Sequence, residues 1–326
     1  MIFNPNIIRS NKFLFNKLLK ILEKYTQDQY LNKLPHGLLD FIYLRIRSNL
    51  KNRYEWRRNP IRTKKIFNNY YQHIMKYKSI DNQVILDLGC GKNNSLSIAT
   101  AFLLNGAKKG YAIESNLSYN KLEINSEAIS SGLYEMLLDC YAFKDEWLKV
   151  NNGKHFNYIL EKIDMKSLAN GEWIEGTKQL NIDLFGNGLN NAKIPKGYID
   201  ILVSHVVLEH IFNFKEEIKT IYDLMNNDSL MVHSVAFWDM RKFFSNKYND
   251  WSFLYENKNY TDKYCNRLRV NEMKEIFDEV GFDVLEIIRK SKKIPENIYN
   301  KLDPHYKEMT KEDIETIQCV FIIRKP

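Results

Sequence analysis

The sequence predicts an α/β fold built on a doubly wound, mostly parallel sheet. Short apolar runs alternate with amphipathic segments from about residue 83 onward. A glycine turn, Gly89-Cys90-Gly91, directly follows the first of these runs, and an acidic residue, Glu114, ends the second. Together these observations indicate a strand–helix–strand unit that binds a nucleoside at the carboxyl ends of its strands.

The alternation predicts seven strands, near residues 83–88, 109–114, 157–163, 199–205, 229–235, 282–290 and 316–324. Residues 165–197 are rich in Asn and Gly, and we expect an inserted loop there. Residues 236–275 are rich in aromatic residues and are expected to cover the substrate side. Residues 1–80 predict a basic helical N-terminal segment, with amphipathic helices near 11–25, 37–50 and 66–78. The catalytic domain would then span residues 81–326.

Positive charge is concentrated in the N-terminal segment. Residues 1–80 contain 17 Lys/Arg and 4 Asp/Glu, a net +13 within an overall +8, so the rest of the chain carries −5. This asymmetry suggests an anionic partner such as a membrane surface, a nucleic acid or a phosphorylated substrate. Lysines that solvate helix surfaces explain it equally well. Peripheral membrane contact through residues 1–65 is an alternative to the preferred interpretation, packing of the first helix on the core.

The cysteines and the apolar runs favour a cytoplasmic protein, at most peripheral at the inner membrane face. The four cysteines are far apart and form no CxxC pair, which argues against a disulfide framework and against a cysteine-based zinc site. No metal site is predicted. No apolar run approaches the ~18 residues needed to span a bilayer.

The glycine turn differs from a dinucleotide site. The run Asp87-Leu88-Gly89-Cys90-Gly91 lacks the third glycine of such a site, and Asp87 would repel a pyrophosphate but suit an ammonium group. This D-x-G-x-G turn resembles motif I of class I S-adenosylmethionine-dependent methyltransferases. In that family the turn holds the methionine part of the cofactor, and the acid after the second strand holds the ribose.

The resemblance implies S-adenosyl-L-methionine as cofactor, bound by Asp87, Gly89, Cys90, Gly91, Glu114 and Ser115. It also implies the family's Rossmann-like seven-stranded sheet, with helices on both faces and an antiparallel final strand inserted between its neighbours.

Other candidate residues follow the third and fourth expected strands. Asp164 resembles the family's acceptor for the adenine amino group, although a helix or turn cap is the alternative. Ser204 and His205 would face the sulfonium and the acceptor. Glu209 and His210, in a family-like LEH run, would contact the substrate, although the histidine there is more often structural.

Methyl transfer to oxygen requires removal of a proton, which a histidine does well near neutral pH. His233 and His205 are the candidate bases, and Asp239 is the candidate orienter or alternative base. The alternative is that each is a hydrogen-bonded polar residue at a strand end.

Two later strings suggest the acceptor. The His233–Asp239 and Tyr264–Arg269 regions resemble H-x-x-D-x-x-D-H-like and Y-x-N-R-L-R-like strings of methyltransferases from bacterial glycan and surface-polysaccharide clusters. Ala236 and Met240 depart from the first string. This likeness implies methyl transfer to a hydroxyl or amine of a sugar or glycan precursor. A phosphorylated or lipid-linked precursor is one alternative.

Asn266, Arg267 and Arg269 would bind the phosphate of such an acceptor, since arginine forks match phosphate geometry. A structural role, with ion pairs to Glu272 or Asp278, is the alternative.

Two other functions stay open. The basic segment would suit an RNA methyltransferase, although the Asn/Asp-Pro-Pro-Tyr/Phe signature common in base-amine methylation is missing. A pseudoenzyme that binds the cofactor without catalysis is the other alternative.

Overall fold

The computed structural model describes residues 60–92, 94–115, 117, 126–149, 153–255 and 265–326. The predicted helices near 11–25 and 37–50 lie outside these residues. Seven strands form one sheet in the order β3-β2-β1-β4-β5-β7-β6. The strands are β1 (Val84–Leu88), β2 (Lys109–Glu114), β3 (Ile182–Gly186), β4 (Ile199–His205), β5 (Met225–Ala236), β6 (Asp283–Ser291) and β7 (Thr316–Lys325).

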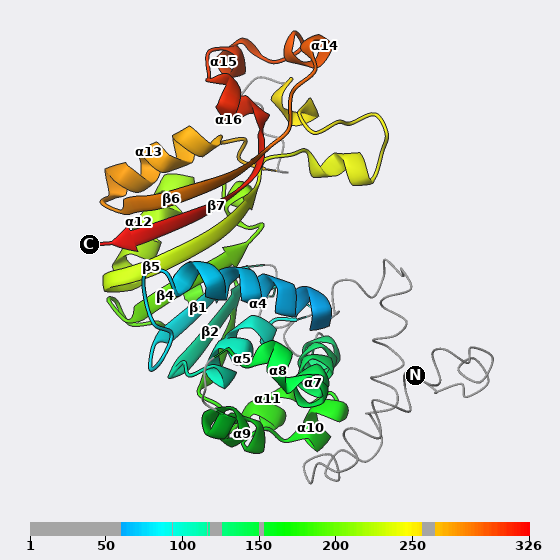
Figure 1. Cartoon of the computed structure of the whole chain (residues 1–326), viewed down its shortest axis with the longest axis vertical. Coiled ribbons are helices and arrows are strands. Elements are labelled where there is room, and N and C mark those ends of the chain that lie inside the picture. The colour runs from blue at the N-terminus through cyan, green and yellow to red at the C-terminus, as the bar shows by residue number, and fades with distance from the viewer. Residues whose placement is uncertain (1–59, 93, 116, 118–125, 150–152, 256–264) are drawn as a thin grey trace, which may run out of the picture.

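The final strand confirms the expected topology. β7 pairs antiparallel with both β5 and β6, whereas β1 to β5 pair in parallel. The order reverses between β1 and β4, and ligands of doubly wound sheets bind at such a switch point. In Figure 1 the parallel strands end on the side opposite the arrowhead of β7.

Helices cover both faces of the sheet. The helices from α4 to α13 are α4 (Pro60–Ile74), α5 (Ser97–Leu104), α7 (Ser126–Ala142), α8 (Lys144–Trp147), α9 (Gly153–Glu161), α10 (Met165–Ala169), α11 (Trp173–Thr177), α12 (Phe214–Leu224) and α13 (Val270–Val280). One apolar core joins α4, α5, α7 and α9 to the sheet, and a second joins α12 and α13 to its other face. Alternate strand residues serve the two cores: Ile85 belongs to the first and Leu86 to the second.

The predicted strand at 157–163 is wrong. Those residues belong largely to α9, whose buried Phe156, Ile159 and Leu160 have the spacing of one helix face. The third strand is instead the five-residue β3, which lies within the expected loop at 165–197, together with α10 and α11. β3 is an edge strand with a partly exposed pattern, so its sequence lacks a strong apolar signal.

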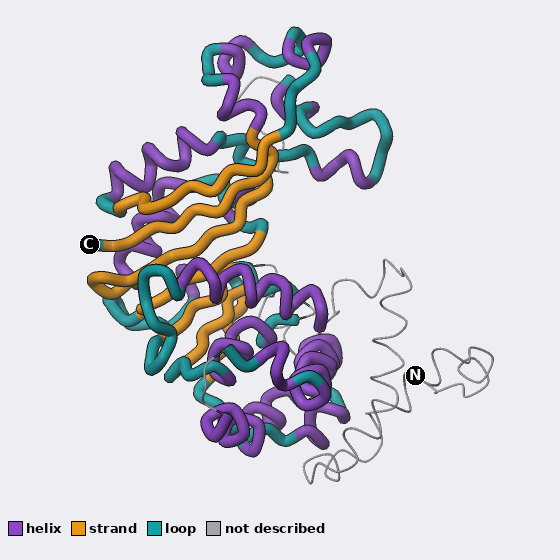
Figure 2. The backbone as a smooth tube through the Cα atoms, in the orientation of Figure 1, coloured by secondary structure: helices purple, strands orange, loops and turns teal. Residues whose placement is uncertain are grey.

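A small lobe stands beyond the carboxyl ends of β5 and β6 (Figures 1 and 2). It consists of residues 237–255 and residues 292–315, and the latter contain α14 (Glu296–Tyr299), α15 (Pro304–Lys307) and α16 (Lys311–Glu315). Its own apolar cluster includes Trp251, Phe253, Ile294, Tyr306 and Ile314. We call this unit the upper lobe. None of the described helices is long and apolar enough to cross a membrane.

Candidate active site

The glycine turn after β1 brings backbone close to open space. Gly89 and Gly91 have φ angles of +70° and +81°, which L side chains rarely adopt. A Cβ atom on Gly89 would lie 2.3 Å from Cγ2 of Val207, so this glycine also allows the turn to pack against the residues after β4. A Cβ atom on Gly91 would meet nothing within 4 Å, so this part of the turn faces a cavity.

Two buried carboxyl groups flank the turn. Glu114 Oε2 accepts a hydrogen bond from the Gly91 amide at 2.9 Å. Asp87 is 4% exposed, and its Oδ2 has no hydrogen-bond partner among the described residues. Burial, and then the charge of Glu114, raises the pKa of Asp87 to about 8. The site therefore has a polar oxygen that a cationic group would satisfy.

These residues line a cavity of about 580 Å³ at the carboxyl ends of β1, β2 and β4. The lining residues are Arg62, Thr63, Ile66, Tyr70, Asp87, Gly89, Cys90, Gly91, Lys92, Asn94, Ile98, Glu114, His205 and Val206. Five of the expected cofactor residues and one candidate base thus meet in one place. Ser115 is exposed and is not among the lining residues.

The sequence prediction missed one wall of the cavity, which α4 supplies through Arg62, Thr63, Ile66 and Tyr70. Asn94 Nδ2 donates to Thr63 Oγ1 at 3.2 Å and so links this helix to the segment after the glycine turn. The spacing of four between Arg62, Ile66 and Tyr70 is the signal that the sequence offered, because such residues share one helix face.

The end of β4 also lines the cavity, through His205 and Val206. Burial, followed by the positive charge of Arg62, lowers the pKa of His205 to about 4, so its imidazole is neutral near pH 7. The next residue, Val206, has a φ of +59°, which is unfavourable for a β-branched side chain. Its amide donates to the Ser234 carbonyl at 2.7 Å, which holds this conformation. A neutral histidine beside strained backbone is typical of a functional site.

His233, the other candidate base, is not in the cavity. It is fully buried, its Nδ1 lies 2.7 Å from Ser204 Oγ, and its ring stacks on Phe277 of α13. Burial lowers its pKa to about 3. The structure therefore corrects two expectations, because Ser204 and His233 pair with each other within the sheet, where inward-facing residues of β4 and β5 meet.

Asp239 is engaged by an arginine. Its two carboxylate oxygens accept from Arg241, with Oδ1 to Nε at 3.0 Å and Oδ2 to an Nη atom at 2.8 Å, and Oδ1 also accepts from the Arg241 amide. These bonds cap a 3₁₀ turn, Met240–Phe243. Asp239 was expected as orienter or alternative base; its carboxylate is used within its own turn, and His233 pairs with Ser204 instead.

Asp164 also differs from its expected role. It precedes α10 as the N-cap and accepts from the amides of Lys166 and Ser167 at 3.0 and 3.2 Å. Because the third strand ends at Gly186, Asp164 does not stand at a strand end, and the adenine assignment loses its basis.

The LEH run forms a second, much smaller cavity with the segment after Cys265. Glu209, His210, Asn266 and Arg267 are among its lining residues. Glu209 Oε1 accepts from the Ala236 amide at 3.1 Å, and burial raises the pKa of Glu209 to about 8. Its Oε2 has no hydrogen-bond partner within the described parts of the chain.

Asn266 has a structural role. Its Nδ2 donates to the carbonyls of Leu208 and Ile211 at 2.7 and 2.9 Å, and its amide donates to the Glu209 carbonyl. These bonds close the turn after β4. The expectation that Asn266 binds substrate phosphate is wrong, since its amide group is used within the protein.

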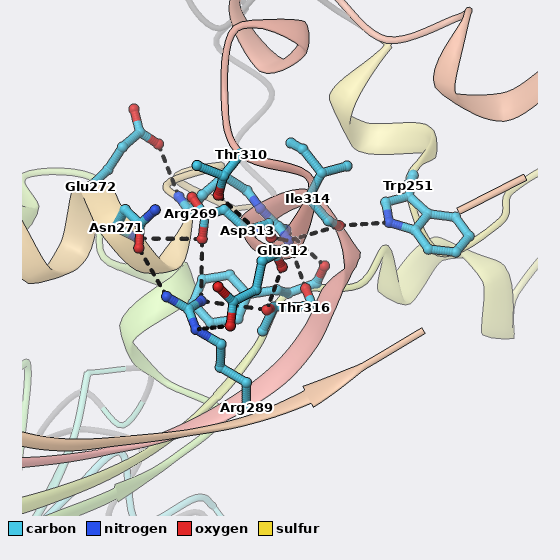
Figure 3. Close-up of polar contacts among 11 residues, drawn as sticks. Trp251, Arg269, Asn271, Glu272, Arg289, Thr310, Glu312, Asp313, Ile314 and Thr316 are labelled. Carbon is cyan, nitrogen blue, oxygen red and sulfur yellow. Dashed lines mark hydrogen bonds and ion pairs between the residues drawn. The ribbon is translucent and has the colours of Figure 1, made fainter. Parts of the chain in front are cut away.

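Arg269 is buried rather than exposed to a ligand, and Figure 3 shows its surroundings. Nη1 donates to the Phe237 carbonyl at 3.0 Å, and Nη2 lies within hydrogen-bond distance of the carbonyls of Asp313, Ile314 and Thr316. Its expected phosphate role is therefore wrong. The guanidinium instead ties the two segments of the upper lobe together, and burial lowers its pKa to about 10.

Comparison with known proteins identifies the family of the chain. The chain matches the family model for a methyltransferase domain over residues 55–287. No curated protein matches it. An S-adenosylmethionine-dependent methyltransferase from Mesorhizobium loti is 13% identical with a TM-score of 0.40, over 78% of this chain and 97% of that chain.

Two further structures were solved with bound S-adenosylmethionine. Phosphoethanolamine N-methyltransferase 2 from Haemonchus contortus is 11% identical, with a TM-score of 0.41 over 79% of this chain and 52% of that chain. A geranyl diphosphate methyltransferase is 7% identical, with a TM-score of 0.44 over 80% of this chain and 85% of that chain.

Proposed function

This chain belongs to the family of methyltransferase domains and uses S-adenosyl-L-methionine, and we propose that it methylates a hydroxyl or amine of a sugar or glycan precursor. The observation that carries the proposal is the cavity at the switch point of the sheet, which is lined both by two buried carboxyl groups and by a neutral histidine. Binding and proton removal are thus provided for in one space.

The residues of the cavity fit this cofactor. The unpartnered Oδ2 of Asp87 would accept from the cofactor ammonium, and Glu114 is placed at the end of β2 for the ribose hydroxyls. The missing side chain at Gly91 leaves space for close approach to the backbone. S-adenosyl-L-methionine supplies a methyl group on a sulfonium, which is already strongly electrophilic.

His205 is the residue best placed to take a proton from the acceptor. It lines the cavity, and its neutral imidazole at pH 7 has a lone pair for a hydroxyl or amine proton. The protein otherwise contributes alignment, since methyl transfer requires the acceptor to lie in line with the methyl group. Val206 and the adjoining turn fix the position of this histidine.

The upper lobe supports a sugar as acceptor. Phe243 and Phe244 are 66% and 85% exposed, and Trp238 packs edge-on against Phe243. Exposed aromatic rings of this kind offer flat apolar surface to the apolar faces of sugar rings. Asn266 and Arg267 both line the small cavity beside the LEH run, and of the two Arg267 carries the charge that would contact a phosphorylated carrier.

The test is release of S-adenosylhomocysteine with three acceptor groups: sugar nucleotides, amino sugars and lipid-linked sugar phosphates. We expect turnover with at least one sugar acceptor, reduced about 10²- to 10⁴-fold in His205→Asn while cofactor binding is retained. Tyr158→Phe, an exposed residue of α9, is the control. Turnover on RNA alone would refute the sugar assignment, and cofactor binding without turnover on any acceptor would favour the pseudoenzyme.

A further inference from the structure

One face of α4 looks into the cofactor cavity. Arg62, Ile66 and Tyr70 are spaced by four residues, and all three line it. Neighbouring positions of the same helix, Phe67 and Ile74, are fully buried in the core and anchor it to the sheet. This helix therefore presents its side chains from a fixed position, which is what a binding surface needs.

The second observation concerns the hydroxyl of Tyr70, which has no hydrogen-bond partner among the described residues. The side chain is fully buried and, in the part of the chain that the structure describes, its Oη makes no hydrogen bond. Buried tyrosine hydroxyls usually find a partner, so this one is notable. Tyr70 and Asp87 line the same cavity, and burial, followed by the negative charge of Asp87, raises the Tyr70 pKa above its usual value.

Arg62 brings positive charge to the same region. Its charge lowers the pKa of His205 and opposes the rise at Tyr70, so it acts on two residues that line the cavity. The α-amino-acid end of the methyl donor carries an ammonium and a carboxylate. Asp87 matches the ammonium, and a guanidinium is the side chain that best matches the carboxylate.

We propose that Arg62 and Tyr70 of α4 bind the α-amino-acid end of the methyl donor, in the cavity that they line together with Asp87. Arg62 pairs with the ligand carboxylate, and the Tyr70 hydroxyl bonds to the same amino-acid group. The inference rests on the cofactor site proposed above. It adds to that site two residues of α4, which lie outside the glycine-turn motif.

The test compares two ligands by isothermal titration. S-adenosylhomocysteine has the amino-acid end, whereas 5′-methylthioadenosine has the nucleoside without it. We expect Arg62→Met to lower the affinity for S-adenosylhomocysteine about 10- to 100-fold, and Tyr70→Phe to lower it about 2- to 10-fold. The affinity for methylthioadenosine should change less than about twofold in both variants. Lys65→Met and Tyr71→Phe remove a charge and a hydroxyl from the same helix outside the cavity and should leave both affinities unchanged.

The outcomes separate this inference from the cofactor assignment. Equal weakening of both ligands in Arg62→Met and Tyr70→Phe would overturn the inference, as would unchanged affinity for both. If wild-type protein binds neither ligand, the cofactor site itself is wrong. Should Arg62→Met fail to fold, S-adenosylmethionine without its carboxyl group is titrated into wild-type protein. We expect affinity about 10- to 100-fold below that of the intact cofactor, and equal affinity would refute the role of Arg62.

Discussion

Replacing Arg269 by Met should cost about 3–5 kcal/mol of unfolding free energy, because it breaks a buried charged network while keeping the side-chain volume similar. Nη1 and Nη2 reach four carbonyls, but Nη2 has only two hydrogens for three of them, so about three full hydrogen bonds are lost. At about 1.5 kcal/mol or more for each charged bond, this loss approaches the whole stability of a marginal domain.

Urea unfolding followed by tryptophan fluorescence measures this loss. Trp251 is a suitable reporter, because its indole Nε1 donates to the Ile314 carbonyl beside the guanidinium. Arg324→Met is the matched control. Arg324 pairs with Asp283 at the surface, and its replacement should cost less than about 1 kcal/mol. Unchanged stability in Arg269→Met, combined with weaker acceptor binding, would refute the structural role and restore the phosphate-binding one.

Three further predictions concern the site. Because the pKa of Asp87 is about 8 in the free protein and a bound ammonium favours the ionised form, cofactor affinity should rise with pH by up to about tenfold per unit on the acid side of pH 8, and fall again once the ligand's own α-amino group loses its proton. Titrations in buffers of different ionisation enthalpy should show release of about one proton below pH 8, and a flat profile in wild-type protein would contradict this. Gly89→Ala should lower the free energy of unfolding in urea by about 2–4 kcal/mol, because the new Cβ atom would lie 2.3 Å from Val207. Gly91→Ala should lower it by about 1 kcal/mol and should also weaken cofactor binding. Equal costs would argue against the packing described here. Glu209 has a pKa raised from 4.5 to about 8, so the folded protein keeps a proton that the unfolded chain releases, and stability should fall as pH rises from about 4.5 to 8. Glu209→Gln should remove this part of the pH dependence of urea unfolding, and an unaltered profile would exclude Glu209 as its source.

The sequence predicted the parts of the fold that carry strong apolar patterns. β1, β2 and β4 are apolar runs with buried neighbours on both faces, and each lies within two residues of its predicted bounds. β3 was missed because a five-residue edge strand has little apolar surface to bury. The spacing of Phe156, Ile159 and Leu160, at i, i+3 and i+4, is the sequence signal that indicates α9.

Residues of the candidate site were likewise predictable where local sequence positions them and not where distant packing does. Asp87 and Glu114 were predicted because a local turn and its two strands bring them together, and local geometry is readable in sequence. Arg62 lies 25 residues before Asp87, and only the packing of α4 on the sheet brings it into the cavity. The role of Arg269 could not be predicted, because the backbone carbonyls that it binds belong to residues more than 30 positions away. A ligand-binding arginine and a structural one look the same in the sequence.

The upper lobe has an evolutionary consequence. It is assembled from two strand connections, it has an apolar cluster separate from the two cores of the sheet, and Arg269 joins its parts through backbone carbonyls that any residue can provide. Side chains on the outside of the lobe are therefore free to diverge while the cofactor cavity is inherited unchanged. Under the proposed function, the outer surface of the lobe is therefore the part of the molecule where substitutions can be introduced without disturbing the cavity for the methyl donor.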